Sequence, residues 1–324
     1  MGGSESNAAA LHVPVLAERI VELLAPALAE PGSIYVDGTL GMGGHSERIL
    51  RSCPNATAIG IDRDPAALQL AGERLAGYGK RVRLHHATYH ELPDVLADEG
   101  VTAVQAICLD LGLSSLQIDS VERGFAYATD APLDMRMNSE QSLTAADIVN
   151  TWSESELARI LRVHGEERFA SRIAGAIVKA RNHAEFTTSA QLVAVIADAI
   201  PMAARHTGGH PAKRSFQALR IAVNDEIASL AAVLPAALQA LAPGGRLAVL
   251  AYHSGEDRLV KRAFAQAVSD RVPAGVPEVP AGYAAEFQLL TRGAERPDAV
   301  EIETNPRAAS ARLRALVRHQ EVVR

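Results

Sequence analysis

The stretch from Ile34 to His45, IYVDGTLGMGGH, limits the possible folds of this chain more than any other segment. An apolar run ends in Asp37 and breaks into a glycine-rich turn, a helical pattern follows, and a second apolar run ends in Asp62. Strand, glycine loop, helix, strand and acidic residue in this order are typical of the nucleotide-binding half of a doubly wound α/β sheet. Glycines let the backbone approach a ligand closely and allow a positive φ. A carboxylate at the end of the second strand is placed to accept both hydroxyls of a ribose.

The glycine loop alone does not identify the ligand. A dinucleotide fingerprint requires G-x-G-x-x-G, and after Gly41 and Gly43 the third glycine is replaced by Ser46. A nucleoside without a pyrophosphate, such as S-adenosylmethionine, therefore fits the loop as well or better. An NAD-dependent dehydrogenase is disfavoured by the missing glycine, and a glycine turn in an enzyme that uses neither ligand stays open.

Composition limits the class of protein. The 324 residues allow more than one domain, and 48% apolar with 22% charged residues is ordinary for a soluble globular protein. No apolar run approaches the ~20 residues of a membrane span, and no signal peptide pattern opens the chain. Two cysteines, Cys53 and Cys108, are too few for a disulfide framework or a zinc site. We predict a cytoplasmic protein without a membrane partner, with residues 1–10 as a flexible tail.

The net charge of −6 argues against a nucleic-acid binder whose whole surface is basic. A phosphate backbone needs only one positive face, however. Three local clusters could supply one: Arg205, His206, His210, Lys213, Arg214 and Arg220; Arg258, Lys261 and Arg262; and Arg307, Arg312, Arg314 and Arg318. Each cluster taken alone is more often a solvated face than an RNA site.

Strand and helix patterns alternate regularly up to the buried strand predicted at Val104–Gly112, which indicates a parallel sheet. The next such strand is Arg246–His253, and the gap is far longer than the dozen or so residues of a parallel crossover. Helical patterns fill it, at 145–152, 154–162, 166–182 and 189–200. We therefore predict an α/β domain from 11–132 and 219–324, interrupted by an all-helical domain at 133–218.

Two further patterns complete the predicted sheet. A helix from Gln217 to Leu241, or its second half, is the crossover into the strand at 246–253. Glu286–Arg292 and Ala311–Arg318 alternate apolar and polar residues, which predicts an antiparallel hairpin at the edge of the sheet.

Ligands of open α/β sheets bind outside the carboxyl ends of the strands, at the point where the strand order reverses. This rule predicts that several polar strand ends meet in one site: Gly41–His45, Asp62, Tyr89, Asp110–Asp119 and Tyr252–Arg258. Each residue alone could be a solvated loop residue, but their convergence is what a binding site requires.

Two other chemistries are weakly supported. Ser114, His253 and Asp110 could form a nucleophilic triad, but the G-x-S-x-G elbow is absent. The histidines of HHATYH, His85, His86 and His90, lack a partner carboxylate at helical ligand spacing. We predict no metal site.

Seven motifs in the same order resemble those of one family: VDGTLGMGGHS, DLGLSSLQID, RGFAYATDAPLDMRM, GEERFASRI, HPAKRSFQALRIAVNDE, GGRLAVLAYHSGEDRLVK and NPRAASARLRA. Together they are similar to the MraW family, the ribosomal small-subunit RNA methyltransferase H family, from about His12 to Arg318. No single motif would be specific. The resemblance implies a class I S-adenosylmethionine-dependent methyltransferase fold with a helical insertion, which agrees with the periodicity. It also implies N4-methylation of a cytidine in the decoding region of bacterial 16S rRNA in the small subunit; a homodimer is left open.

The resemblance also implies functional residues. The cofactor residues by position are Gly43, Gly44, His45, Asp62, Tyr89, Asp110 and Gln117. Tyr89 would lie beside the adenine, where the family often has phenylalanine. The chain departs from the family at Gly255, Ala131 and Ala309, none of which belongs to the cofactor set.

The exocyclic amine of cytosine is a poor nucleophile, because its lone pair is delocalised into the ring. A site must accept hydrogen bonds from the amine and align it with the sulfonium methyl. Asp110, Ser114 and His253 are the candidate catalytic residues, with His253 or water taking the proton. C5-methylation would instead require an exposed thiolate, and neither Cys53 nor Cys108 is suitably placed.

The target base must leave its helix to react. Arg205, Lys213, Arg214 and Arg220 of the helical insertion are candidate contacts to the RNA backbone. The alternative function is a non-catalytic, nucleotide-sensing RNA-binding module that keeps this fold.

Overall fold

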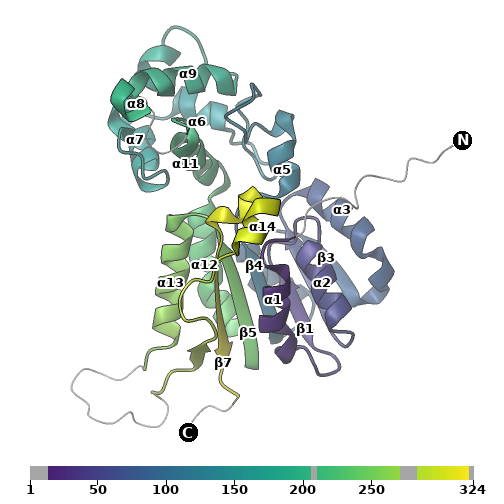
Figure 1. Ribbon diagram of the computed structural model, residues 1–324. Helices are drawn as coiled ribbons and strands as arrows, with labels where there is room; N and C mark the ends of the chain where they lie inside the picture. Colours follow the sequence, from purple (N-terminus) through teal and green to yellow (C-terminus); the bar gives the residue numbers. More distant parts are fainter. Residues whose placement is uncertain (1–13, 206–209, 271–282, 321–324) are drawn as a thin grey trace, which may run out of the picture. The chain divides into compact units, whose positions relative to one another are not determined.

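The computed structural model describes residues 14–205, 210–270 and 283–320. The chain divides into two compact units, Met1–Gly112 with Ser229–Arg324, and Leu113–Ala228 (Figure 1). The predicted insertion at 133–218 falls inside the second unit, which begins earlier and ends later. The predicted tail, residues 1–10, lies outside the described residues.

A seven-stranded sheet forms the centre of the first unit, in the order β3-β2-β1-β4-β5-β7-β6. Its strands are β1 (Ile34–Asp37), β2 (Thr57–Asp62), β3 (Val82–His86), β4 (Val104–Asp110), β5 (Leu241–Ala251), β6 (Phe287–Leu289) and β7 (Arg312–Arg318). Strands β1 to β5 are parallel, and β7 runs antiparallel to both β5 and β6. The antiparallel pair predicted at the sheet edge is thus confirmed. The order reverses between β1 and β4, which places the switch point beside the glycine loop.

Helices cover both faces of this sheet (Figure 1). One apolar core lies against α1 (Ala17–Leu24), α2 (Gly44–Ser52) and α3 (Pro65–Leu75), and the other against α4 (Leu92–Asp98), α12 (Glu226–Ala240) and α13 (Ser254–Ala267). Successive residues of a strand enter opposite cores, as Tyr35 and Val36 do. Strands buried on both faces need continuous apolar runs, which is why the sequence shows runs here instead of alternation.

The remaining elements of this unit are short. They are the 3-10 helices η2 (Ala25–Ala27), η3 (Ala76–Arg81), η4 (Tyr89–Glu91) and η6 (Pro306–Ser310), and the helix α14 (Ala299–Thr304). β3 ends at His86, and Thr88 and Glu91 then form a capping box that starts η4. β5 begins before the predicted Arg246, and the LAPGG turn is an irregularity within it in which Gly244 has a φ of 78°.

The second unit is helical. Its elements are α5 (Ser115–Asp119), η5 (Val121–Arg123), α6 (Ala145–Thr151), α7 (Glu154–Val163), α8 (Ala170–Arg181), α9 (Ser189–Ala199), α10 (Met202–Arg205) and α11 (Lys213–Asn224). The four helices predicted between 145 and 200 are all present, although α8 begins later than predicted. Apolar residues at helical spacing, such as Leu157, Ile173 and Leu219, are fully buried in one core.

The stretch from Gln217 to Leu241 forms two helices instead of one, and its second half, α12, is the predicted crossover into β5. α11 ends at Asn224, Asp225 adopts a left-handed conformation with a φ of 49°, and α12 begins at Glu226. The buried Asn224 amide fixes this break, because its Oδ1 accepts from Met137 N and its Nδ2 donates to Met135 O, both at 2.8 Å. Among the described residues no single helix has the length and apolar character to cross a membrane; the bent pair α11 and α12 meets that test by length and composition only.

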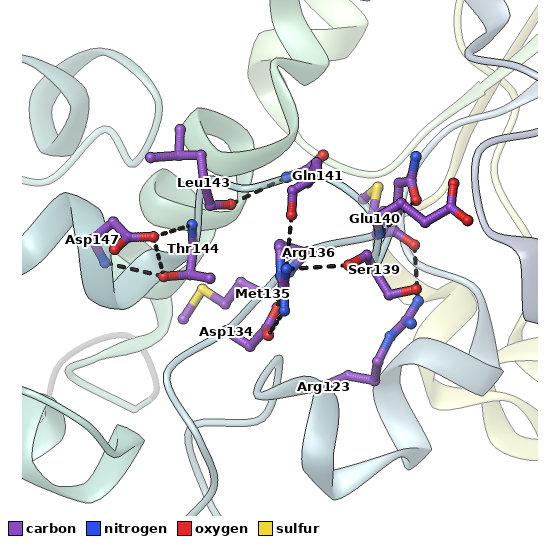
Figure 2. A network of polar contacts seen from close by, with 12 residues as sticks. Arg123, Asp134, Met135, Arg136, Ser139, Glu140, Gln141, Leu143, Thr144 and Asp147 are labelled. Atoms are coloured by element: carbon purple, nitrogen blue, oxygen red, sulfur yellow. Dashed lines mark hydrogen bonds and ion pairs between the residues drawn. The ribbon is translucent and has the colours of Figure 1, made fainter.

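The segment around Arg136 shows how the DMRM motif is used (Figure 2). The Arg136 guanidinium donates to both carboxylate oxygens of Asp134, at 2.9 and 2.6 Å, and to the carbonyls of Ser139 and Gln141. Met135, between the pair, is buried with a φ of 62°. The motif therefore folds a strained loop onto the helical core.

Candidate active site

The glycine loop lies at the carboxyl end of β1, as predicted. Gly41 and Gly43 have φ values of 52° and 78°, which only glycine adopts without strain. Gly43 N donates to Leu40 O at 2.8 Å, and Leu40 N donates to Ile61 O at 2.9 Å. The loop is thereby tied to β2, and its last glycine, Gly44, opens α2.

Asp62 fixes this loop from the end of β2. Its Oδ2 accepts from Gly41 N at 2.7 Å and its Oδ1 from Asp64 N at 2.8 Å. Burial raises the pKa of Asp62 to about 6, against the opposing effect of these backbone donors. Each carboxylate oxygen retains a second lone pair, so the residue can position the loop and still accept a ligand hydroxyl.

Asp110, at the end of β4, is the centre of a second polar group. Its carboxylate lies 3.2 Å from Nε2 of His45 and accepts a 2.8 Å hydrogen bond from the hydroxyl of Tyr252. Its backbone N–H donates to Oγ1 of Thr39 at 2.6 Å. The structure thus brings together residues from the glycine loop, from β4 and from the end of β5, as the strand-end rule predicted.

His45 is buried at the start of α2. Burial alone would lower its pKa, but the hydrogen bond to Asp110 and the negative charge of that carboxylate outweigh burial and raise the pKa. Its Nδ1 is buried and has no hydrogen-bond partner among the described residues. Such an atom is costly to bury unpaired, so it fits a polar group of a bound ligand.

The structure explains why Ser46 occupies the position of the third glycine, which the sequence alone did not explain. The hydroxyl of Ser46 donates to Oδ2 of the buried Asp37 at 2.7 Å, and the hydroxyl of Tyr35 lies 3.1 Å from the same oxygen. Burial raises the pKa of Asp37. A glycine at position 46 would leave this carboxylate with one donor fewer.

Three other predicted residues have local structural roles. Tyr89 opens η4 after β3 and packs, half-buried, against the second sheet core. In the second unit, Ser114 Oγ accepts from Gln117 N at 3.3 Å, and the Gln117 side chain accepts from Ser114 N at 3.2 Å. The two residues form a capping box on α5, which accounts for the Ser114 hydroxyl without nucleophilic chemistry.

His253 caps α13. Its Nδ1 accepts from Gly255 N at 3.2 Å and from Glu256 N at 3.4 Å, while its Nε2 lies 3.3 Å from Oε1 of Glu256. To take a proton on Nδ1 it would have to release this cap. The described hydrogen bonds of the Asp110 side chain go to His45 and Tyr252, and none joins it to His253. The His–Asp pair that a triad requires is therefore not formed between these two residues.

The histidines of β3 also have local partners. Nε2 of His85 lies 2.7 Å from Oε1 of Glu99, and Nε2 of His86 lies 3.0 Å from Arg63 O. Successive side chains of a strand point to opposite faces, so these two do not converge on one ion.

The candidate RNA-binding residues of the second unit differ in their surroundings, since some form ion pairs and others are exposed. Arg220, predicted to contact RNA, forms a two-pronged ion pair with Glu226, at 2.8 Å for each nitrogen. Lys213 and Arg214 are exposed at the start of α11, whereas the side chain of Arg205 lies outside the described part of the chain. An RNA contact by Arg220 would have to break its pair with Glu226.

The carboxyl-terminal basic cluster is also occupied. Asp257 of α13 pairs with Arg314 at 2.8 Å and with Arg312 at 3.3 Å. Arg318 donates to Leu241 O and pairs with Glu286. Arg312, Arg314 and Arg318 thus hold β7 to its neighbours.

The departures from the family pattern fit the fold. Ala131 is buried, its N–H donates to Ser189 Oγ and its carbonyl accepts from Ser189 N. Ala309 is exposed in η6. Gly255 lies in the first turn of α13, where its N–H contributes to the cap by His253.

The comparison with known proteins agrees with these observations. The chain matches the model of the MraW methylase family over residues 9–319. It is 56% identical over 313 residues to a protein named ribosomal RNA small subunit methyltransferase H from Acidothermus cellulolyticus, covering 97% of this chain and 95% of that one. It is 58% identical over 305 residues to the protein of the same name from Mycolicibacterium gilvum, covering 94% and 82%.

Among solved structures, a crystal structure of an rRNA methylase from Streptococcus thermophilus aligns over 96% of this chain and 100% of that chain. The TM-score is 0.44 and the identity 13%, so this likeness adds nothing on function. The match to the family model and the identity to curated relatives both extend over nearly the whole chain. The chain therefore belongs to the MraW methylase family.

Proposed function

We propose that this protein uses S-adenosylmethionine to methylate N4 of a cytidine in the decoding region of bacterial 16S rRNA, as part of the small ribosomal subunit. Membership of the MraW methylase family and the names of the curated relatives support methylation of small-subunit rRNA. The single observation that carries the chemistry is the meeting of the glycine loop, Asp62 and Asp110 at the carboxyl ends of β1, β2 and β4. Such a substrate would place the protein in the cytoplasm.

The residues of the first unit fit this methyl donor. The positive φ values of Gly41 and Gly43 shape the loop beside Asp62, whose free lone pairs suit the two ribose hydroxyls. The unpaired Nδ1 of His45 suits a polar group of the amino-acid portion. Once bound, the donor supplies an electrophilic sulfonium methyl. Gly43, Gly44 and Tyr89 keep their predicted cofactor roles as part of this proposal, and the cofactor role of Gln117, a residue of the second unit, stays a prediction.

Asp110 is the proposed acceptor for the cytosine amine. Its carboxylate is fixed by two donors and half-buried, and it keeps lone pairs for an N–H of the amine. Accepting that hydrogen bond concentrates the nitrogen lone pair as the amine approaches the methyl in line. The cap held by His253 favours water over this residue as the final acceptor of the proton.

The cysteines support an amine target over a ring carbon. Attack on C5 of cytosine would need a thiolate that can add to the ring. Cys108 is fully buried, and burial raises its pKa well above the usual value. Cys53 is also buried, with its pKa raised for the same reason.

The affinity for the cofactor should fall at acid pH, because protonation of Asp62 competes with binding. The ionised carboxylate accepts the ribose hydroxyls, and its pKa of about 6 means that protonation begins to compete as the pH falls through that value. Below about pH 6 the affinity for S-adenosylmethionine should fall about tenfold per pH unit, since one proton must be released for binding. Calorimetric titration from pH 5 to 8 measures this. A flat profile would show that Asp62 does not bind the ligand as an anion.

The exposed pair at the start of α11 should contact RNA phosphates. Replacing Lys213 and Arg214 together with alanine should reduce the slope of log affinity against log salt by about two, because each cation releases about one counterion. Binding to small ribosomal subunits at several salt concentrations measures it.

The matched control is the double variant Arg51→Ala with Lys80→Ala. These two exposed cations precede β2 and β3, at the sheet edge opposite the strand carboxyl ends, and remove the same charge. The control should leave the salt slope as in the wild type. An equal effect in both double variants would assign RNA binding to general charge rather than to α11.

The decisive experiment incubates the protein with labelled S-adenosylmethionine and small subunits from cells that lack it, followed by nucleoside analysis. Label in N4-methylcytidine supports the proposal. Label in another nucleoside would change the acceptor, and cofactor binding without any transfer would favour the nucleotide-sensing RNA-binding module.

A further inference from the structure

Tyr252 directly follows β5 and has no role among the proposed cofactor-binding or RNA-binding residues. Its hydroxyl donates a 2.8 Å hydrogen bond to Oδ1 of Asp110, and His45 lies 3.2 Å from Oδ2 of the same carboxylate. The two oxygens therefore have different partners. A carboxylate held in this way cannot rotate about its Cβ–Cγ bond without breaking one of the two contacts.

The tyrosine is itself held in place. Its backbone N–H donates at 2.8 Å to Oε2 of the buried Glu256, the residue that also forms the capping box of α13 with His253. On the other side, its ring packs on Gly112, where a Cβ would lie 3.1 Å from Cδ2 of the ring. Gly112 has a φ of 117°, so the position favours glycine for both its backbone and the ring contact. These contacts fix the orientation of the Tyr252 side chain, and with it the position of the hydroxyl beside Asp110.

From this geometry we infer that Tyr252 is a positioning residue for methyl transfer: its hydroxyl holds the Asp110 carboxylate so that a free lone pair faces the acceptor amine. The inference rests on the proposed function. In the reaction, the nitrogen lone pair forms the new N–C bond while the C–S bond breaks and its electron pair stays on sulfur. One amine proton then leaves to water. Tyr252 touches neither reacting atom and acts only through Asp110.

The test is Tyr252→Phe, which keeps the ring against Gly112 and removes only the hydroxyl. We expect kcat to fall roughly ten- to a hundredfold, because small displacements of a catalytic group have effects of that order. KM and Kd for S-adenosylmethionine should stay within about twofold, because the hydroxyl is assigned to the acceptor side. A raised KM with an unchanged kcat would instead assign it to cofactor binding and overturn the inference.

Tyr35→Phe is the matched control. The Tyr35 hydroxyl also contacts an aspartate, Asp37, at 3.1 Å, but it is buried within β1 and has no role in the proposed chemistry. This variant should lower Tm and leave kcat unchanged. If both variants lose activity in proportion to their loss of Tm, Tyr252 is merely structural.

A double-mutant cycle with Asp110→Asn separates the two residues. If Tyr252 acts only through the carboxylate, Tyr252→Phe should cause no further loss of single-turnover rate in the Asp110→Asn background. Additive losses would contradict the inference. A wild-type protein that transfers no methyl would remove the proposed function as well, whereas an active wild type with an equally active Tyr252→Phe variant removes this inference alone.

Discussion

Asp62→Ala should bring S-adenosylmethionine binding below detection or weaken it on the order of a hundredfold or more. Hydrogen bonds to a charged group contribute about 1.5–3 kcal/mol each, and each 1.4 kcal/mol is about tenfold in affinity, so losing two ribose contacts is enough. The substitution also frees Gly41 N and Asp64 N, which hold the glycine loop and the turn before α3. Calorimetric titration measures the affinity.

The neighbouring carboxylate provides the control for this prediction. Asp64 caps α3 by accepting from Ala66 N at 3.1 Å, and Asp64→Ala should cost about 1 kcal/mol of stability, as loss of an N-cap does. Its cofactor affinity should change little by comparison. Wild-type binding by a folded Asp62→Ala variant would reject the ribose role and the nucleoside site with it.

Asp110→Asn should reduce kcat by about 10²–10³ at saturating cofactor, the usual range for removing one preorganised group that stabilises developing charge. The amide keeps the shape of the side chain, but its nitrogen cannot accept a hydrogen bond from the amine or from Tyr252. Single-turnover methylation of small subunits measures the chemical step. Because Asp110 also belongs to the predicted cofactor set, the Kd for S-adenosylmethionine is measured in parallel.

Two outcomes would contradict this role of Asp110. A variant with wild-type kcat at saturating cofactor would show that the carboxylate does not assist transfer. A variant whose only defect is a raised Kd would leave Asp110 as a cofactor residue, and the acceptor amine would need another partner.

Much of the fold could be predicted because its signals are local. The run into Asp37, the glycine loop and the run into Asp62 each lie within one stretch of chain, and the structure confirms the strand, loop and helix there. Asp64 followed by Pro65 is a local helix-start pattern, and α3 begins there. The missing strand between Gly112 and Arg246 correctly predicted helices in that interval, because helical periodicity is visible without knowledge of contacts.

Errors arose where distant residues set the local structure. The helix predicted across Asp225 breaks because Asn224 is committed to the backbone of Met135 and Met137, whose separation from it in sequence is 89 and 87 residues. Helical periodicity in the sequence around Asp225 does not reveal these distant hydrogen bonds. α13 begins at Ser254 because His253, a catalytic candidate from the sequence, serves as its cap.

The sequence by itself determined the family, the α/β alternation and the ends of the strands where a ligand would bind, because these depend on the order and periodicity of residues. Only the tertiary structure decided which polar groups are available there. Contacts across 65 and 142 residues set Asp110 between His45 and Tyr252. Ion pairs with Glu226 and Asp257 occupy arginines that the sequence offered as RNA contacts. Ion pairing and hydrogen bonding depend on distances between side chains, and those distances exist only once the chain has folded.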